Sequence, residues 1–135
     1  MDSIGKHAAY WEAGSSLCMA IEKKSKPELI GTISLFSFYE ESRRAEVGYI
    51  LSRSYWGSGI MSEALKAILK YAFLDLNLNR LEADIDPDNV ASAGLLKKMG
   101  FQLEGLLKER WIVSGQVTDT ELYGLLRKNY LTANH

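Results

Sequence analysis

Two glycines one residue apart stand between a strand-like segment and a long amphipathic segment. The run reads Tyr55-Trp56-Gly57-Ser58-Gly59-Ile60-Met61-Ser62-Glu63-Ala64-Leu65. Glycine has no Cβ atom, so the backbone can turn tightly there and a ligand can approach it closely. A helix that starts directly behind the turn directs its unpaired N–H groups and the positive end of its dipole at the turn. Residues 56–62 therefore predict an anion site, and the expected anion is a phosphate or pyrophosphate.

Two well-known phosphate motifs do not account for this turn. A P-loop ends in Gly-Lys-Ser/Thr, whereas Gly59 is followed by isoleucine and methionine, which excludes it. A dinucleotide fingerprint is imitated by Gly57-x-Gly59-x-x-Ser62, with an acidic residue at 82 or 84 on the next strand. That fingerprint places its first glycine directly after the strand, but six residues separate the strand ending at 50 from Gly57. A helix N-terminus capped by Ser54 or Ser58, without a ligand, is the simplest alternative.

The hydrophobic pattern predicts the elements that hold this turn. Alternating apolar residues indicate strands at 17–21, 29–38, 45–51, 81–85, 101–113 and 117–126. Helical spacing indicates a helix from Gly59 to Leu76 with Leu76 on its apolar face, a second from Val90 to Met99 that ends at Gly100, and a short helix within 6–13. Polar segments at 22–28 and 40–44 are predicted turns. This order predicts an α/β fold: a mixed sheet, antiparallel at both ends, with a helical crossover in the middle.

Composition and charge restrict the class of protein. The 135 residues predict one domain over 1–135, and 47% hydrophobic with 24% charged residues is ordinary for a globular protein. The net charge of −1 argues against non-specific binding to nucleic acid, which needs a basic face. No apolar run is long enough to span a bilayer, and residues 1–7 lack the apolar core of a signal peptide. The only cysteine, Cys18, excludes an internal disulfide and fits a reducing compartment. These features predict a soluble cytoplasmic domain.

Two motifs follow one another in the middle of the chain. The first is Glu46-x-Gly48-Tyr49 with the glycine run behind it, and the second is Asn89-x-x-Ser92-x-x-Leu95-x-x-Lys98-Met99-Gly100-Phe101. Together they resemble the GNAT superfamily of N-acetyltransferases, and most of all its RimJ/RimL branch of ribosomal-protein N-terminal acetyltransferases. A weaker match follows at 104–105, 115 and 119–123, so the resemblance covers roughly residues 28–127.

The resemblance implies the GNAT fold and acetyl-CoA as co-substrate. In that fold the strand at 45–51 is splayed from the strand at 81–85, which leaves backbone N–H and C=O groups unpaired. The pantetheine arm would pair with them like an extra strand, and the pyrophosphate would bind the N–H groups of residues 56–62. The implied acetyl-CoA-binding residues are Tyr49, Ile50, Leu51, Trp56, Gly57, Ser58, Gly59, Ile60, Met61, Ser62, Asn89 and Ser92.

Several of these positions carry a second interpretation. Gly48 would relieve crowding in the splayed region, or it is a simple bulge glycine. Trp56 is expected to cover the turn and pack on the sheet rather than touch a substrate. Asn89 would bind pantetheine, but asparagine also favours the helix N-cap without any ligand. The family places glutamine or arginine where this chain has Ser54, so the neighbouring Arg53 or the backbone alone would take over that role.

Acetyl transfer to an amine needs a base and a group that stabilises the developing oxyanion. Glu46 is the candidate base, because it lies on the cleft strand two residues before Gly48 and can act directly or through a water molecule. A solvent-facing strand carboxylate is the alternative interpretation. A backbone N–H group of Tyr49 or Ile50 would stabilise the oxyanion.

The general acid is the point at which this chain departs from many members of the superfamily. They carry a tyrosine where this chain has Leu96, which cannot donate a proton. The resemblance to the RimJ/RimL branch implies Ser92 as the acid or thiolate partner instead, with Tyr49 and Tyr123 as substitutes. A covalent acyl-enzyme on Cys18 is disfavoured, since free cysteine usually behaves as a small buried apolar residue.

The acceptor is expected to be a primary amine. At pH 7 deprotonation costs roughly 1.4 kcal/mol for an α-amine but roughly 4.6 kcal/mol for a lysine, so a weak base favours a protein N-terminus or a small amine. The sequence does not choose among a ribosomal protein, a peptide, a polyamine and an antibiotic. Acidic residues either form an entrance for cations or a solvated rim; these are Glu40, Glu41, Glu104, Glu109 and Asp119.

The N-terminal segment is short for the superfamily. Members normally begin with a strand and one or two helices, whereas about sixteen residues precede Leu17 here. The first strand or helix is therefore expected to be missing or shortened, and the uncovered sheet edge predicts a homodimer. The alternative to an active enzyme is a CoA- or acetyl-CoA-binding module without catalysis, either a sensor or a truncated remnant.

Overall fold

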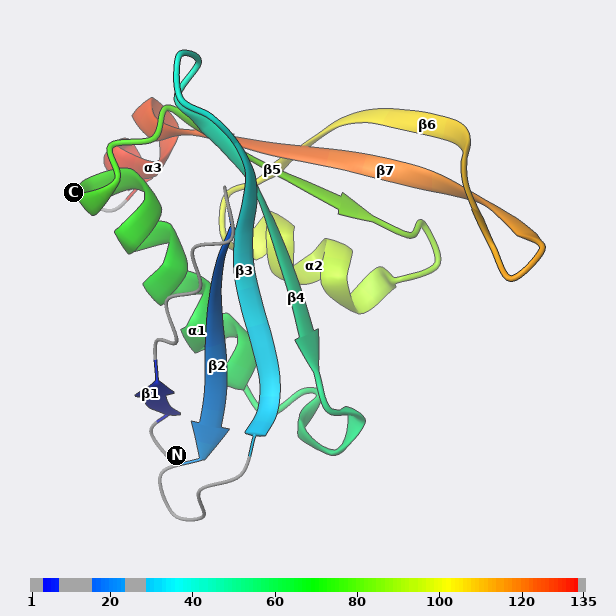
Figure 1. Ribbon diagram of the computed structural model, residues 1–135, viewed down its shortest axis with the longest axis horizontal. Helices are drawn as coiled ribbons and strands as arrows, with labels where there is room; N and C mark the ends of the chain where they lie inside the picture. The colour runs from blue at the N-terminus through cyan, green and yellow to red at the C-terminus, as the bar shows by residue number, and fades with distance from the viewer. Residues whose placement is uncertain (1–3, 8–15, 24–28, 134–135) are drawn as a thin grey trace.

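Seven strands form one sheet in the computed structural model, which describes residues 4–7, 16–23 and 29–133 (Figure 1). The strands are β1 (Ile4–His7), β2 (Leu17–Lys23), β3 (Leu29–Tyr39), β4 (Arg44–Leu51), β5 (Arg80–Ile85), β6 (Gln102–Val113) and β7 (Gln116–Leu126). The helices are α1 (Ile60–Lys70), α2 (Val90–Lys98) and α3 (Arg127–Ala133), with a 3-10 turn at Arg53–Tyr55 and a π turn at Tyr71–Asp75. Across the sheet the order is β1-β2-β3-β4-β5-β7-β6.

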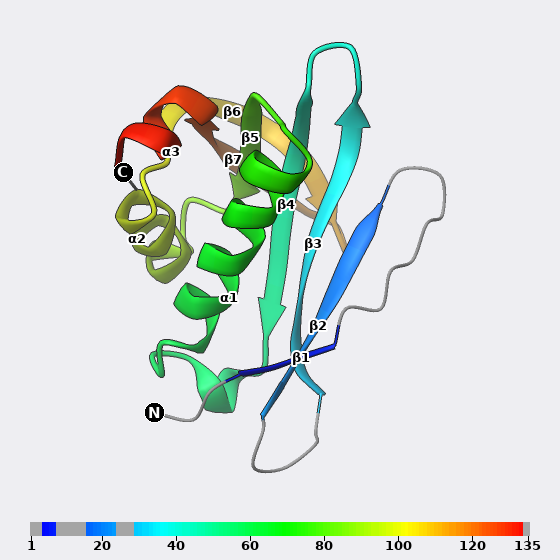
Figure 2. The same ribbon diagram turned by 90° about the vertical axis from the view of Figure 1, so that its left-hand side faces the viewer.

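The three helices of the described region lie on the same side of the sheet (Figure 2). The apolar face of α1, with Leu65 and Ile68 fully buried, packs there against the buried residues of the central strands. Alternate residues of β4 and β5, including Val47 and Leu81, supply the sheet side of this core. The alternation follows from the strand period of two, which sends neighbouring side chains to opposite faces. Within the described residues, no helix is both long and apolar enough to cross a membrane.

The centre of the sheet is splayed, as the resemblance to the GNAT superfamily implies. Strands β4 and β5 are parallel and pair only over Arg44–Arg80, Ala45–Leu81 and Glu46–Glu82. Strand β4 nevertheless continues to Leu51 and β5 to Ile85. All other neighbouring strands are antiparallel. The predicted mixed sheet, antiparallel at both ends with a crossover in the middle, is therefore confirmed.

The predicted strands and the two main helices are present, with boundaries shifted by one or two residues. The short helix predicted within 6–13 is wrong at residues 6–7, which pair with β2 as part of β1; its remainder lies outside the described residues. Residues 24–28 of the turn predicted at 22–28 also lie outside them. Helix α3 was not predicted from the sequence. The helix contacts the core through the ring of Tyr130, which stacks on the ring of Phe73 with 4.9 Å between the ring centroids.

The first main helix ends differently from the prediction. The sequence places Leu76 on the buried face of the helix, but Leu76 is 37% exposed and Leu78 is buried instead. The cause is the π turn that follows Lys70, in which the N–H of Leu76 donates to the carbonyl oxygen of Tyr71 at 3.0 Å. A π turn holds more residues than an α turn. It therefore rotates the following residues relative to an α-helix and carries Leu76 out of the core.

Gly48 is required by packing and is not a bulge glycine. The pairing of β3 with β4 is regular at Ser34–Gly48, and its irregularity lies between Phe36 and Tyr39, where Ser37 has a φ of 53°. A Cβ atom on Gly48 would lie 3.0 Å from the ring of Phe36. The crowding that Gly48 relieves thus comes from the neighbouring strand.

A guanidinium–carboxylate bridge crosses the sheet at the closed end of the splay. Arg80 of β5 donates to both carboxylate oxygens of Glu104 on β6, at 2.6 and 3.0 Å, and to Glu82 at 2.8 Å. Strand β7 lies between β5 and β6, and the bridge passes over it at Gly124. A Cβ atom on Gly124 would run into the Glu104 carboxylate. Glycine at 124 therefore leaves room for the bridge, and a larger residue would force the two side chains to shift. The Arg80 guanidinium in turn holds the pKa of Glu104 below its usual range.

Gly124→Ala is expected to lower the free energy of unfolding by up to about 1 kcal/mol, because the added methyl group displaces an ion pair whose Glu104 carboxylate is 37% exposed. Gly105→Ala is the matched control on β6, since a Cβ there meets nothing within 4 Å. Urea unfolding of both variants measures the difference. Equal losses in the two variants would show that the bridge does not depend on residue 124.

Candidate functional site

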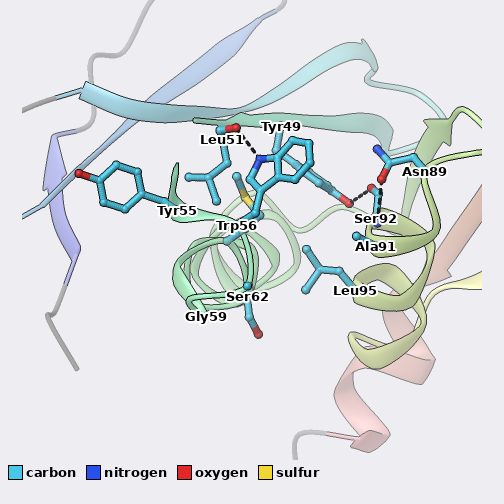
Figure 3. Close-up of a pocket in the computed structure, with 12 residues that line it drawn as sticks. Tyr49, Leu51, Tyr55, Trp56, Gly59, Ser62, Asn89, Ala91, Ser92 and Leu95 are labelled. Atoms are coloured by element: carbon cyan, nitrogen blue, oxygen red, sulfur yellow. Dashed lines mark hydrogen bonds between the residues drawn. The ribbon is translucent and has the colours of Figure 1, made fainter. Parts of the chain in front are cut away.

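A cleft of about 300 Å³ opens beyond the paired part of β4 and β5 (Figure 3). The end of β4, the glycine turn, the first turn of α1 and the N-terminal part of α2 surround it. Its lining residues are Tyr49, Leu51, Tyr55, Trp56, Gly57, Gly59, Met61, Ser62, Asn89, Ala91, Ser92 and Leu95. Two motifs that are distant in the sequence thus line one cavity.

The glycine turn leaves the N-terminus of α1 open toward the cleft. Gly57 and Gly59 have φ values of 77° and 84°, in the left-handed region that disfavours other residues. Gly59 is the N-cap, and no side chain caps the helix. Glu63 makes the first intrahelical bond, its N–H donating to the carbonyl oxygen of Gly59 at 3.1 Å. The N–H groups of residues 60–62 therefore have no intrahelical acceptor.

A simple serine cap does not explain the turn. The hydroxyl of Ser58 donates to the carbonyl oxygen of Tyr55 at 2.5 Å, back within the turn. The side chain of Ile60 is buried in the core, so only its backbone can face a ligand. The alternative of a helix capped by Ser54 or Ser58 is accordingly wrong. The described lining of the cleft contains no lysine or arginine, so the donors at the uncapped end of α1 are its backbone N–H groups and the hydroxyl of Ser62.

Successive residues of β4 point their backbone N–H and C=O groups alternately to β3 and to the gap. The N–H of Ser52 donates to the carbonyl oxygen of Ile30 at 2.7 Å, on the β3 side. Because backbone groups alternate in direction along an antiparallel strand, those of Ile50 also face β3, while those of Tyr49 and Leu51 face the gap. Of the two predicted oxyanion donors, only the Tyr49 N–H faces the gap. The side chain of Ile50 is 73% exposed and does not line the cleft.

Trp56 occupies the mouth of the gap. Its indole N–H donates to the carbonyl oxygen of Leu51 at 2.8 Å, and its side chain lines the cleft while it stays 60% exposed. The indole thereby satisfies one of the backbone groups that the splay leaves without a strand partner. Figure 3 shows the ring between the end of β4 and α2. Trp56 therefore lies at the ligand-facing side of the turn.

Helix α2 supplies a hydrogen-bonded chain that reaches β4. Asn89 is the N-cap, and its Oδ1 accepts the N–H of Ser92 at 3.1 Å. The Ser92 hydroxyl, buried to 7% exposure, lies 2.6 Å from the Tyr49 hydroxyl, and either oxygen can donate. Burial raises the pKa of Tyr49, and the hydrogen bond to Ser92 opposes that shift. The Tyr49 hydroxyl is therefore protonated at neutral pH and able to donate at the cleft.

The other candidate acids do not reach the cleft. Tyr123 is 1% exposed, and its hydroxyl donates to Glu121 at 3.4 Å; neither residue lines the cavity. Leu96, at the position of the usual tyrosine, is fully buried in the core. Cys18 lies on β2, two strands away from β4, and does not line the cavity. Of the substitutes named from the sequence, Tyr49 is the one at the site.

The structure does not bring Glu46 into the same cavity as Ser92. Glu46 is three residues before Tyr49 on β4, so its side chain faces the opposite side of the sheet, away from the helices. It stands beside Glu82 of β5, at the last pair before the strands separate. The cleft lining also includes residues that the sequence analysis missed, namely Tyr55, Ala91 and Leu95. Leu95 follows Ser92 by one helical turn, a spacing that indicates a shared face.

Comparison with known proteins agrees with this fold. Residues 2–102 match the model of the acetyltransferase (GNAT) domain family. The protein belongs to the GNAT family of acetyltransferases. Enzymes of this family use acetyl-CoA as co-substrate. The prediction of the superfamily from the two motifs is therefore confirmed, while the RimJ/RimL branch stays a prediction.

Similar proteins include N-acetyltransferases of several kinds. The chain is 39% identical over 117 residues to the uncharacterized N-acetyltransferase p20 of Bacillus licheniformis, over 87% of this chain and 66% of that protein. It is 31% identical to the spermidine N(1)-acetyltransferase of Escherichia coli, over 77% of this chain and 56% of that protein. It is 28% identical to the ribosomal protein uS5-alanine N-acetyltransferase of Escherichia coli, over 90% of this chain and 63% of that protein. The chain thus spans less than two thirds of each relative.

The fold is shared with solved structures. A dodecameric spermidine N-acetyltransferase from Vibrio cholerae matches with a TM-score of 0.83 and 24% identity, over 91% of this chain and 71% of that chain. The predicted GNAT fold is confirmed by this likeness and by the splayed sheet.

Tyr49→Phe is expected to cost about 1 kcal/mol at neutral pH through the lost hydrogen bond to Ser92. The pKa of Tyr49 in the folded protein lies above its ordinary value of 10, so above about pH 10 the unfolded state loses this proton first. The contribution of the buried phenol to the free energy of unfolding is therefore fully present below about pH 10, and it is lost as the pH rises above that value. Urea unfolding between about pH 8 and pH 11 should show a shallower fall for Tyr49→Phe than for the wild type.

Ser92→Ala serves as the control for this measurement, because it removes the hydrogen bond but keeps the buried phenol. We expect it to retain the full alkaline fall. Burial also raises the pKa of Tyr123, so part of the fall persists in every variant. Parallel pH profiles of Tyr49→Phe and the wild type would contradict the burial of a protonated phenol at the cleft.

Proposed function

We propose that the protein is an acetyl-CoA-dependent N-acetyltransferase that acts on a primary amine by direct attack in a ternary complex. The observation that carries this proposal is the convergence of three features in one cleft. They are the open backbone of β4, the uncapped N-terminus of α1 and the hydroxyl pair of Tyr49 and Ser92. Each feature suits a different part of acetyl-CoA.

The residues present fit this co-substrate. The N–H groups of residues 60–62, with the left-handed Gly57 and Gly59, suit its pyrophosphate. The gap-facing backbone groups of Tyr49 and Leu51 suit the pantetheine amides, as in the addition of a strand to a sheet edge. Met61, Leu95 and Ala91 supply apolar surface beside them. We propose Asn89 as a further pantetheine ligand, in addition to its role as N-cap.

We assign the acid–base roles from the positions of the side chains. Acetyl-CoA supplies the thioester that the amine attacks. The Tyr49 N–H faces the gap and can stabilise an oxyanion there. The protonated Tyr49 hydroxyl, held at 2.6 Å by Ser92, can donate to a departing thiolate. We therefore propose Tyr49 and Ser92 together as the acid.

Glu46 is proposed as the base from the other side of the gap. It is the last residue of β4 that pairs with β5, and its side chain faces away from the helices. An amine that enters from that face would meet Glu46 at the start of the gap. This arrangement supports a reaction in which the two substrates approach from opposite faces. Either a protein N-terminus or a small amine could be the acceptor in this arrangement. The similar proteins include one enzyme named for each kind of acceptor, a ribosomal-protein acetyltransferase and a spermidine acetyltransferase.

Acetyl-CoA should raise the melting temperature of the wild-type protein, because a ligand that binds only the folded state stabilises it. Gly59→Ala is expected to weaken binding by tenfold or more, since alanine disfavours a φ of 84° and the N–H groups behind it would shift. Gly94→Ala in α2 is the control, because a Cβ there meets nothing within 4 Å. Titration calorimetry measures both. Equal affinities would exclude the glycine turn as the phosphate site.

Catalysis is tested by release of free thiol from acetyl-CoA in the presence of peptides and small amines. We expect Tyr49→Phe and Glu46→Gln each to lower kcat by about 10²-fold, the usual contribution of a general acid or base. Val90→Ala, a substitution at an exposed position of α2 outside the lining, is the control. Acetyl-CoA binding without thiol release from any amine would favour the non-catalytic module. Unchanged turnover in both variants would refute the assigned roles.

We further propose a homodimer formed through the β6–β7 hairpin. In the described region, β6 is an outer strand of the sheet, and the hairpin extends away from the helices (Figure 1). Its exposed apolar residues include Ile112 at 73%, Val113 at 61% and Val117 at 51%. Unpaired edges of this kind invite pairing with another chain. One related structure is dodecameric. The single domain and cytoplasmic location predicted from the sequence remain part of this proposal.

Val113→Lys is expected to shift the protein from dimer to monomer in sedimentation experiments, because it places a charge in the proposed contact. Val90→Lys changes another exposed valine, outside the hairpin, and should leave the dimer intact. A wild-type protein that sediments as a stable monomer would refute the proposed homodimer.

A further inference from the structure

The ring of Phe36 lies on the face of the sheet away from the helices, beside the gap between β4 and β5. Phe36 of β3 pairs directly with Glu46 of β4, and directly paired residues share one face of a sheet. A Cβ atom on Gly48 would lie 3.0 Å from Cε1 and 3.6 Å from Cζ of the ring. The ring therefore lies over the backbone of Gly48, beyond the last pair that β4 makes with β5.

A bulge in β3 keeps Phe36 out of the core. Two residues separate positions 36 and 39 of β3, whereas a single residue separates their partners on β4, and Ser37 has a φ of 53°. The extra residue reverses the alternation of faces that follows it. Phe38 thus packs against the core, while Phe36 does not belong to the core cluster and is only partly buried. The Phe36 ring is available on the surface beside the gap.

The other aromatic and acidic side chains nearby on this face have partners within the chain. Arg44 lies over the Tyr39 ring at 4.0 Å and faces the Glu82 carboxylate at 3.6 Å. The side chains of Phe36 and Glu46, by contrast, have no ion pair, hydrogen bond or aromatic partner within the described residues. An apolar ring and an unpaired carboxylate therefore stand side by side at the start of the gap.

An acceptor that enters from this face would meet both groups together. Its amine must lie near Glu46, the proposed base, and near Tyr49, whose N–H faces the gap. Between these two residues, Gly48 is the position that faces the same side as Glu46. Because Gly48 has no side chain, the Phe36 ring supplies the surface at that position. The carbon atom that bears the amine would then lie against the ring.

We propose that Phe36 determines acceptor specificity by contacting the group attached to the amine-bearing carbon, an inference that rests on the proposed acetyltransferase function. An apolar group that covers the ring removes apolar surface from water, which is favourable. A polar group of the same size loses its water there and gains no hydrogen bond from the ring. The preferred acceptor is therefore a primary amine with an apolar substituent on the carbon that bears it.

Leucinamide and asparaginamide are a matched pair of acceptors, because their side chains are similar in size and each molecule has one reactive amine. We expect the wild type to have a kcat/KM about tenfold higher for leucinamide, the usual scale of one apolar contact. Phe36→Ala should reduce this ratio to within about twofold, mainly by raising KM for leucinamide, and Phe36→Leu should largely restore it. Tyr39→Ala removes another ring from the same strand and face, at the closed end of the splay, and should leave the ratio unchanged.

A purely structural role for Phe36 would affect both acceptors and acetyl-CoA alike. Titration calorimetry checks this, since Phe36→Ala should bind acetyl-CoA with the affinity of the wild type. An unchanged preference for leucinamide in Phe36→Ala, or an equal fall in kcat/KM for both amides, would refute the assigned contact.

Binding of the two amides in the presence of free CoA tests the contact apart from catalysis, because free CoA has no acetyl group to transfer. Leucinamide that binds the wild type more tightly than Phe36→Ala, with neither amide acetylated from acetyl-CoA, would support the contact and count against the proposed function. Acetylation of both amides with equal kcat/KM by the wild type would support the function and refute the contact. A wild type that binds neither amide would also refute it.

Discussion

The separation of β4 from β5 after three residue pairs is the constraint on which the rest of the structure depends. Backbone groups beyond the last pair have no strand partner, and buried backbone groups without partners are costly. Part of the cost is met within the chain, because the indole of Trp56 donates to the carbonyl oxygen of Leu51. The remaining groups of β4 stay open to a ligand that can pair with them. A binding cleft is thus a direct consequence of incomplete strand pairing.

Two sets of polar contacts hold the splay at its two ends. At the closed end, Arg80 binds Glu82 and reaches across β7 to Glu104, while Arg44 lies 3.6 Å from Glu82. These contacts join three strands of the sheet where the gap begins. At the open end, the Asn89 cap fixes Ser92, whose hydroxyl contacts Tyr49 of β4. The position of α2 relative to β4 therefore depends on hydrogen bonds that also shape the cleft.

The sheet separates two chemical environments. The helix side carries backbone donors and hydroxyl groups but, in the described lining of the cleft, no charged side chain. The other side carries Glu46 and Glu82, and Glu82 is bound by Arg80 and faces Arg44. The neutral cleft suits a large ligand held by backbone N–H groups, whereas the Glu46 carboxylate on the other face can accept a proton from an amine. Together they support the proposal that acetyl-CoA and an amine meet at the gap between them.

The sequence by itself determined the local elements, because strand and helix periodicities, the two left-handed glycines and the Asn89 cap act over a few residues. Two ordered motifs also indicated the GNAT family, and that resemblance implied the splayed sheet. Only the tertiary structure decided that Tyr49 contacts Ser92, which stands 43 residues away, and that the helices cover the face of β4 opposite to Glu46. The room that Gly124 leaves for the ion pair could not be predicted either, since that pair joins the strands on either side of β7. Contacts of this kind depend on strand order and helix placement, which no local pattern of residues encodes.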